Sequence, residues 1–298
     1  MHNSKTVEKR SCKIKMNIIL HTLQNSLPLI LAATGALISE YAGVTAVFLD
    51  GIINLSAFLS FVFIIMLKNV PAAVLLTLLC SVLFMTLIAL YTEKSRSNPF
   101  INGIAVNLAA SGIISIASTS LFKTKGVISP AILGVSEEIQ SLFEAGKSFL
   151  GAGSIISVSV VILITGIMLF FSRWGLRTRI TGTNADVLTV RGISPAKYRI
   201  ISWSIAAAFA GTAGTLCMLR LSAFVPNISS GRGWLALASV FLGRKTFAGT
   251  ILAAVSFSAS EYLANNISSP LISPTVLPAL PYIIALLLFY LLGKKKIN

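Results

Sequence analysis

Long apolar runs separated by short polar segments dominate the hydropathy pattern of the chain. Several runs reach the roughly 20 residues that a helix needs to cross a hydrocarbon layer of roughly 30 Å. Because the runs are continuous and do not alternate with a period of two, they predict helices and not barrel strands. We therefore expect an all-α polytopic membrane protein with a single transmembrane domain (1–298). Its roughly eight spans would lie at 17–38, 52–67, 71–91, 100–122, 150–171, 200–219, 248–263 and 277–292.

Two shorter apolar runs, 44–49 and 234–243, are bounded by glycines and are too short to cross a membrane. We expect each to form a half-helix. Short glycine-interrupted segments at corresponding places in two halves point to the solute site of a transporter. The pattern predicts two direct repeats in the same orientation, about 17–122 and about 149–293. Chance similarity between apolar runs is the alternative.

The longest polar and basic segment between spans, 173–199, predicts a docking site for a soluble partner. Its middle, 184–190, can form a short helix with Asn184 as N-cap, because the side chain can accept from amides of the first turn. Asp186 is then favoured by the helix dipole, and Gly192 suits the C-terminal break. A compact capped helix outside the bilayer would give such a partner a rigid contact.

The charged residues bear mainly on how the chain is oriented in the membrane. Only 11% of the residues are charged, against roughly 25% in soluble domains, and the net charge is +15. The basic residues are spread over short loops and both ends, which favours retention on the cytoplasmic side over nucleic-acid binding. We therefore expect cytoplasmic termini and a cytoplasmic 173–199 segment. The segment 123–148, which contains three of the nine acidic residues, predicts an amphipathic helix on the outer face.

Motifs for catalysis or metal binding are absent from the sequence. It contains no GxxxxGK[ST], HExxH or GxSxG pattern, and its three cysteines have no CxxC spacing. We expect no catalytic, cofactor-binding or metal-binding residue in this chain. A transport subunit is therefore favoured over an intramembrane enzyme or a flippase for polymer precursors.

Polar side chains within the predicted spans are candidates for a solute pathway, and we select Asn54, Asn107 and Asp50. Asn107 lies near mid-span, where contact between helices is the commoner role of an amide. Glu40 and Asp50 either line a pathway or sit hydrated at an interface. An alternative function is an ion- or proton-coupled secondary transporter with Glu40, Asp50 and Glu261 as the relay.

Four stretches give the chain a family resemblance. They are ALISEYAGVTAVFLDGIINLSAF, NPFINGIAVNLAASGI, GTNADVLTVRGISPAKYRIISWSIAAAFAGTAGTL and GRGWLALASVFLGRKTFAGTILAA. In this order they resemble the permease subunits of ATP-binding-cassette (ABC) importers for simple sugars and nucleosides. The similarity is greatest to the shorter permease of nucleoside systems with a basic-membrane-lipoprotein type binding protein. The family's loop reads close to GTNPxAAxYAGI, whereas here Ala185 replaces the proline and 188–191 depart. Asp50-Gly51 stands where the family has Glu-Gly.

The resemblance implies a permease subunit in the bacterial inner membrane that moves nucleosides, or a simple sugar such as ribose, by alternating access. ATP and Mg would be bound by separate ABC ATPase subunits. The other implied partners are a second homologous permease or a second copy, an extracytoplasmic substrate-binding lipoprotein and membrane lipids, with no nucleic acid. The residues implied to couple to the ATPase are Gly182, Thr183, Asn184, Ala185, Asp186, Val187 and Gly192.

Overall fold

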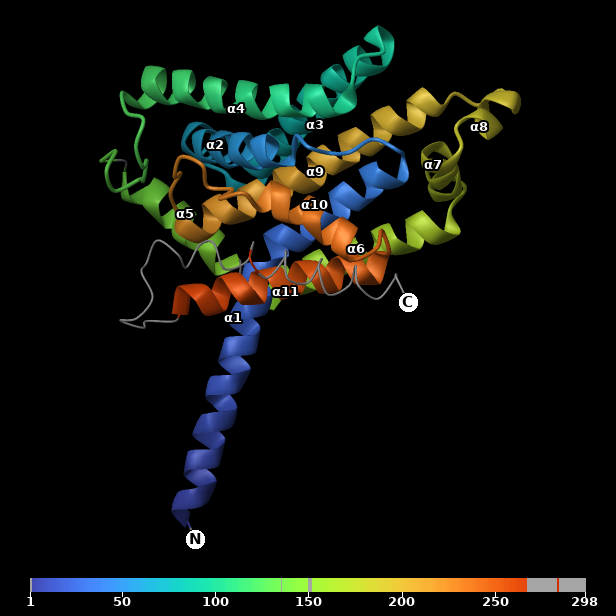
Figure 1. Ribbon diagram of the computed structural model, residues 1–298. Coiled ribbons are helices and arrows are strands. Elements are labelled where there is room, and N and C mark those ends of the chain that lie inside the picture. The colour runs from blue at the N-terminus through green and yellow to red at the C-terminus, as the bar shows by residue number, and fades with distance from the viewer. Residues whose placement is uncertain (1, 135, 150–151, 267–282, 284–298) are drawn as a thin grey trace.

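The computed structural model describes residues 2–134, 136–149, 152–266 and 283, and within them the only regular elements are helices. The predicted span 277–292 lies outside these residues. Figure 1 shows the helices as a bundle from which the first part of α1 projects. They are α1 (His2–Tyr41), α2 (Leu49–Leu67), α3 (Val70–Ser95), α4 (Pro99–Phe122), α5 (Glu137–Phe149), α6 (Ala152–Phe171), α7 (Arg173–Thr183), α8 (Asp186–Val190), α9 (Pro195–Leu221), α10 (Arg232–Leu242) and α11 (Phe247–Asn266).

Five of the described helices, α2, α3, α4, α6 and α9, are long and apolar enough to cross a membrane. They coincide with predicted spans, and this confirms the all-α polytopic class. The helices α1 and α11 cover the predicted spans 17–38 and 248–263. The total of eight spans stays a prediction.

The helix α9 lies at the centre of the bundle and packs against α1, α2 and α3 (Figure 1). Small residues allow this close approach. A Cβ added to Gly214 would lie 3.0 Å from the Ile53 carbonyl carbon of α2, and one on Gly35 of α1 would lie 3.1 Å from the Ala206 Cα. The small-residue pattern at 206–214 therefore predicted a real helix contact.

The helices α1 and α9 run antiparallel, which contradicts the predicted same orientation of two direct repeats. Arg220, in the last turn of α9, donates to the Asn25 side chain at 2.6 Å, so the start of the packed part of α1 lies beside the end of α9. Further along, Gly35 meets Ala206. The prediction was wrong because hydropathy carries no direction, and the orientation of 17–38 rested on basic flanking residues.

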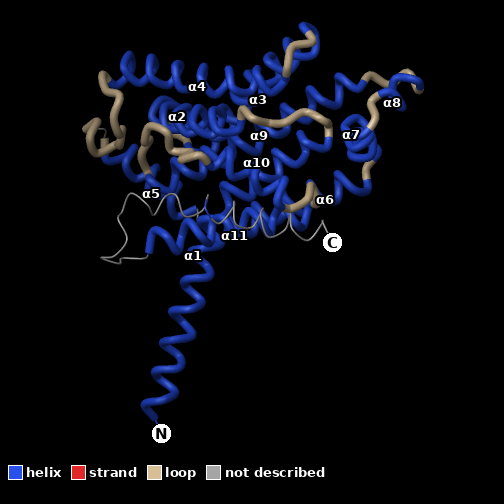
Figure 2. The backbone as a smooth tube through the Cα atoms, viewed as in Figure 1, coloured by secondary structure: helices blue, strands red, loops and turns tan. Residues whose placement is uncertain are grey.

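The first expected half-helix, 44–49, is also absent. A linker of turns and irregular backbone, 42–48, joins α1 to α2 (Figure 2). Gly43 has a φ of +77°, which favours glycine and ends α1, and the Asn107 side chain binds the Val47 carbonyl at 2.9 Å. The second half-helix is confirmed as α10.

The polar ends of the helices define two faces of the bundle. The docking face contains α7, α8, the start of α9 and the end of α3, where Arg199 pairs with Glu93 at 3.7 Å. The opposite face contains α5 and the end of α9, since a Cβ on Gly146 would lie 2.9 Å from Leu219. The expected amphipathic helix is thus α5, on the face away from the docking segment.

Candidate functional site

Within the predicted docking site 173–199, residues 173–193, which we call the docking segment, form two helices where one was expected. The Ser172 hydroxyl caps α7 by accepting from the Gly175 N–H at 3.0 Å. The chain then breaks at Asn184 and turns into α8 at the edge of the molecule (Figure 1). The helix α7 was missed because its arginines and threonines carry little amphipathic pattern.

The capping groups of α8 behave largely as predicted. The Asn184 side chain accepts from the Asp186 N–H at 3.1 Å, although Ala185 is the residue that flanks the helix. Gly192 has a φ of +72°, so a left-handed residue follows α8, as expected from its position. This helix of five residues is thereby fixed at both ends by local hydrogen bonds.

The side chains of α8 divide into an anchor and an exposed apolar pair. Leu188 is 2% exposed and holds the helix to the protein, whereas Val187 is 43% and Val190 is 89% exposed. Exposed apolar side chains grouped on one element are typical of surfaces that a partner covers. The arrangement therefore offers a rigid apolar contact on the docking face.

The end of α7 packs directly on the end of α1. A Cβ on Gly182 would lie 2.8 Å from the Gly43 amide nitrogen and would clash with the Tyr41 carbonyl oxygen. Of the predicted docking residues, Gly182 thus contacts the transmembrane part of the protein. Gly43, the partner of Gly182, was not predicted, because the two glycines are far apart along the chain.

Polar contacts beside this point join α1 to the turn after α10. The Tyr41 hydroxyl donates to the Lys245 carbonyl at 2.7 Å, and the Lys245 ammonium pairs with Glu40 at 2.6 Å. Burial raises the pKa of the Tyr41 phenol above its ordinary value, while the Arg179 guanidinium opposes the shift. The phenol is therefore a neutral donor at physiological pH.

The predicted pathway residues lie on α2 and α4, and each is partly exposed while binding protein groups. The Asn107 side chain, besides binding Val47, accepts from the Gly51 N–H at 2.7 Å. Asn54 accepts from the Ser229 N–H at 3.0 Å and donates to its hydroxyl at 2.9 Å. These two amides hold the start of α2 and the loop before α10, and their role toward a solute stays a prediction.

Asp50 connects α2 to the start of α10. Its carboxylate accepts from the Gly233 N–H at 3.1 Å, at a helix N-terminus that favours negative charge. Arg232, the residue before Gly233, pairs with Glu261 of α11 at 2.5 Å. Arg232 was not among the sequence candidates, and only its place before the predicted half-helix could have indicated it.

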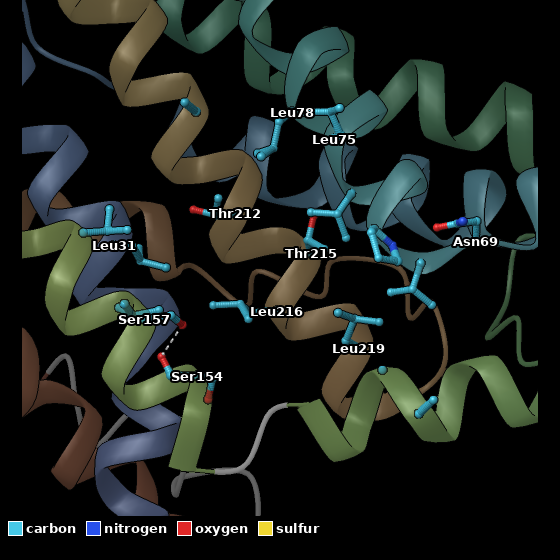
Figure 3. A pocket seen from close by; sticks show the side chains of 18 of the residues that line it. Leu31, Asn69, Leu75, Leu78, Ser154, Ser157, Thr212, Thr215, Leu216 and Leu219 are labelled. Atoms are coloured by element: carbon cyan, nitrogen blue, oxygen red, sulfur yellow. Dashed lines mark hydrogen bonds between the residues drawn. The ribbon is translucent and has the colours of Figure 1, made fainter.

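A cavity of about 990 Å³ opens between α3, α5, α6 and α9 (Figure 3). Its wall is mostly apolar, with leucine and valine the commonest residues, and the hydroxyls of Thr212 and Thr215 donate to carbonyls of their own helix. The three predicted pathway residues do not line it. This wall fits an apolar occupant better than a polar solute.

No group of three or more His, Cys, Asp or Glu side chains in the part of the chain that the structure describes could hold a metal ion. The groups that meet at the docking face and around α10 are an exposed helix, a glycine contact and a set of hydrogen bonds between helices.

Similar proteins point to membrane transport. The chain is 26% identical over 264 residues to the nucleoside ABC transporter permease protein NupC of Lactococcus lactis, covering 83% of this chain and 81% of that protein. It is 27% identical over 259 residues to the guanosine ABC transporter permease protein NupQ of Bacillus subtilis, with the same coverage.

One solved structure shares the fold. It is an inward-facing conformation of a putative metal-chelate type ABC transporter, with a TM-score of 0.56 and 17% identity, over 93% of this chain and 85% of that one. The sequence pattern described as "Branched-chain amino acid transport system / permease component" matches residues 18–293. This match covers most of the chain, which therefore belongs to that family of non-catalytic membrane components of ABC transporters.

Proposed function

We propose that this chain is the permease subunit of an ATP-driven importer of nucleosides in the bacterial cytoplasmic membrane. The observation that carries the proposal is α8, a capped helix on the docking face whose Val187 and Val190 side chains are exposed. An ABC ATPase that binds ATP and Mg would cover these side chains. The nucleoside assignment rests on the similarity to NupC and NupQ.

The same proposal orients the molecule. We assign the docking face to the cytoplasm, where basic residues are retained. The start of the packed part of α1 then lies on the extracytoplasmic face, because α1 and α9 are antiparallel, and this differs from the predicted cytoplasmic N-terminus. The basic residues of the docking face that support the assignment are Lys94, Arg96, Arg173, Arg177, Arg179, Arg191, Lys197, Arg199, Arg244 and Lys245.

We assign two further partners to the protein in this orientation. The face with α5 would receive the extracytoplasmic substrate-binding lipoprotein. A second permease, homologous or identical, would complete the solute path. We assign Asn54, Asn107 and Asp50 to this path, since they are partly exposed and an amide both donates to and accepts from a ribose or base. In the conformation described here a solute would have to exchange with their bonds to the protein.

The ion-coupled alternative has less support. Glu40 and Glu261 are each paired with a cationic side chain, and Asp50 accepts from a helix N-terminus. A role as relay would require these carboxylates to exchange their partners within the chain, whereas the similar proteins are ABC transporter permeases.

Assembly tests the proposal. The chain, expressed together with its ATPase, is purified through an affinity tag, and the bound ATPase is measured. We expect the ATPase to co-purify with the wild type and to be lost when both exposed valines of α8 become aspartate. The same double change on the opposite face, at Val127 and Ile132, is the control, because both side chains are exposed there. ATPase retained by the α8 variant would contradict the proposed docking.

A further inference from the structure

Besides its contacts with α6 and α9, the docking segment touches the end of α1 at two glycines that meet backbone to backbone. A Cβ on Gly43 would lie 2.9 Å from the Gly182 Cα, and a Cβ on Gly182 would lie 2.8 Å from the Gly43 nitrogen. Gly43 is held at a φ of +77°, where side chains are strained. Because no side chain separates the two main chains, displacement of α7 must displace the linker 42–48 as well.

The linker is tied to α10 at both of its ends. On the docking face, Tyr41 binds the Lys245 carbonyl and Glu40 binds the Lys245 ammonium, just beyond the end of α10. At the other end of the linker, Asp50 accepts from the Gly233 N–H at the start of α10. Residues 40–50 and 232–245 therefore form one closed unit, which we call the α10 clamp.

The α10 clamp also binds residues 222–231, which form the loop before α10. Arg232 donates to the Ile228 carbonyl at 3.2 Å and pairs with Glu261. Asn54, one turn beyond Asp50 on α2, makes two hydrogen bonds to Ser229. A shift of α10 would therefore move this loop.

We propose that Gly43 and Gly182 are positioning residues for transport. Their contact passes movement of the docked α7–α8 segment to the α10 clamp, and the clamp moves the loop 222–231 between closed and open arrangements. This inference rests on the proposed function, because an ATPase has to move α8. It assigns the two glycines to coupling and leaves ATPase binding to the exposed valines.

The test separates ATP hydrolysis from solute movement. The full chain is purified with its co-expressed partners and reconstituted in proteoliposomes, with radiolabelled guanosine as the probe. For Gly182→Ala we expect ATPase binding and hydrolysis within about twofold of wild type, while guanosine moved per ATP falls about tenfold, within the usual range of coupling changes. The matched control is Gly112→Ala, where an added Cβ meets nothing within 4 Å, and its ratio should stay unchanged.

A second variant removes a tie of the clamp without adding an atom. Tyr41→Phe deletes the hydrogen bond to Lys245, and we expect the guanosine-to-ATP ratio to fall about threefold. Tyr91→Phe, at a tyrosine that is 63% exposed on α3, should leave the ratio unchanged. Tyr41→Phe decides the test if Gly182→Ala does not assemble.

The outcomes separate the coupling role of the two glycines from the proposed ATP-driven import. An active wild type whose ratio is unchanged by Tyr41→Phe, or by an assembled Gly182→Ala, overturns the coupling role alone. A wild-type complex that moves guanosine without any need for ATP overturns the proposed function and the coupling role together.

Discussion

The docking segment and the α10 clamp are built in opposite ways. In the docking segment, α8 is held by one buried leucine and local hydrogen bonds, and it presents apolar side chains to the outside. In the clamp, the polar side chains of Glu40, Tyr41 and Asp50 bind partners on the α10 side of the protein. The exposed side chains of the docking segment suit it to a partner that arrives from solution. The internal hydrogen bonds of the α10 clamp suit it to passing movement from one helix to the next. The two regions should therefore respond differently to substitution.

The largest effect is expected inside the clamp, at Gly233. A Cβ there would lie 2.6 Å from the Asp50 Cα, so Gly233→Ala must push α2 and α10 apart. We expect this overpacking to lower the free energy of unfolding by about 3 kcal/mol. Thermal stability of the detergent-solubilised protein measures it, with Gly112→Ala as the control that should keep its midpoint. An equally stable Gly233→Ala protein would mean that the contact is loose.

The next effect concerns the docking segment. Val190→Asp places a charge on the most exposed side chain of α8, and we expect it to weaken ATPase binding by about 2 kcal/mol, the size of an interface hot spot. The unfolding midpoint should not change, because the side chain makes little contact within the chain. Titration of the purified ATPase onto the reconstituted protein gives the affinity. Unaltered affinity would show that α8 is not the contact.

Gly192→Val tests the turn that ends α8. A left-handed residue with a branched side chain costs roughly 1–2 kcal/mol, so α8 should end at a different place or detach. We expect uptake of guanosine to fall although membrane insertion and the amount of protein are normal. Transport at the wild-type rate would argue that the ATPase does not need this geometry.

The smallest effect compares one substitution in both regions. Asp50→Ala removes the acceptor of the Gly233 N–H, which should cost about 1 kcal/mol. Asp186→Ala makes the same change in the first turn of exposed α8, where the carboxylate acts on the helix dipole through solvent and contributes about 0.3 kcal/mol. Equal losses of thermal stability in the two variants would contradict the difference in burial between the regions.

The sequence predicted what depends on neighbouring residues. Apolar runs located α2, α3, α4, α6 and α9, and the glycine-bounded run 234–243 located α10. The short helix near Asn184 followed from capping chemistry, and the close approach of α9 followed from its small residues.

The sequence did not reveal what depends on residues far apart. The antiparallel packing of α1 and α9 depends on contacts such as Arg220 with Asn25, and apolar patterns do not encode direction. The linker 42–48 contains a hydrophobic run that resembles a half-helix, but Gly43 and the bond from Asn107 hold it irregular. The contact between Gly43 and Gly182 was also not predicted, because neither glycine by itself indicates a partner elsewhere in the chain.

Whether ATP drives transport is measured by uptake of radiolabelled guanosine into proteoliposomes that contain this chain, its co-expressed ATPase and its binding lipoprotein, with no ion gradient. We expect accumulation that requires ATP on the side of the docking face and that is lost when Val187 and Val190 are both changed to aspartate. Uptake without ATP that collapses when a proton or sodium gradient is dissipated would contradict it.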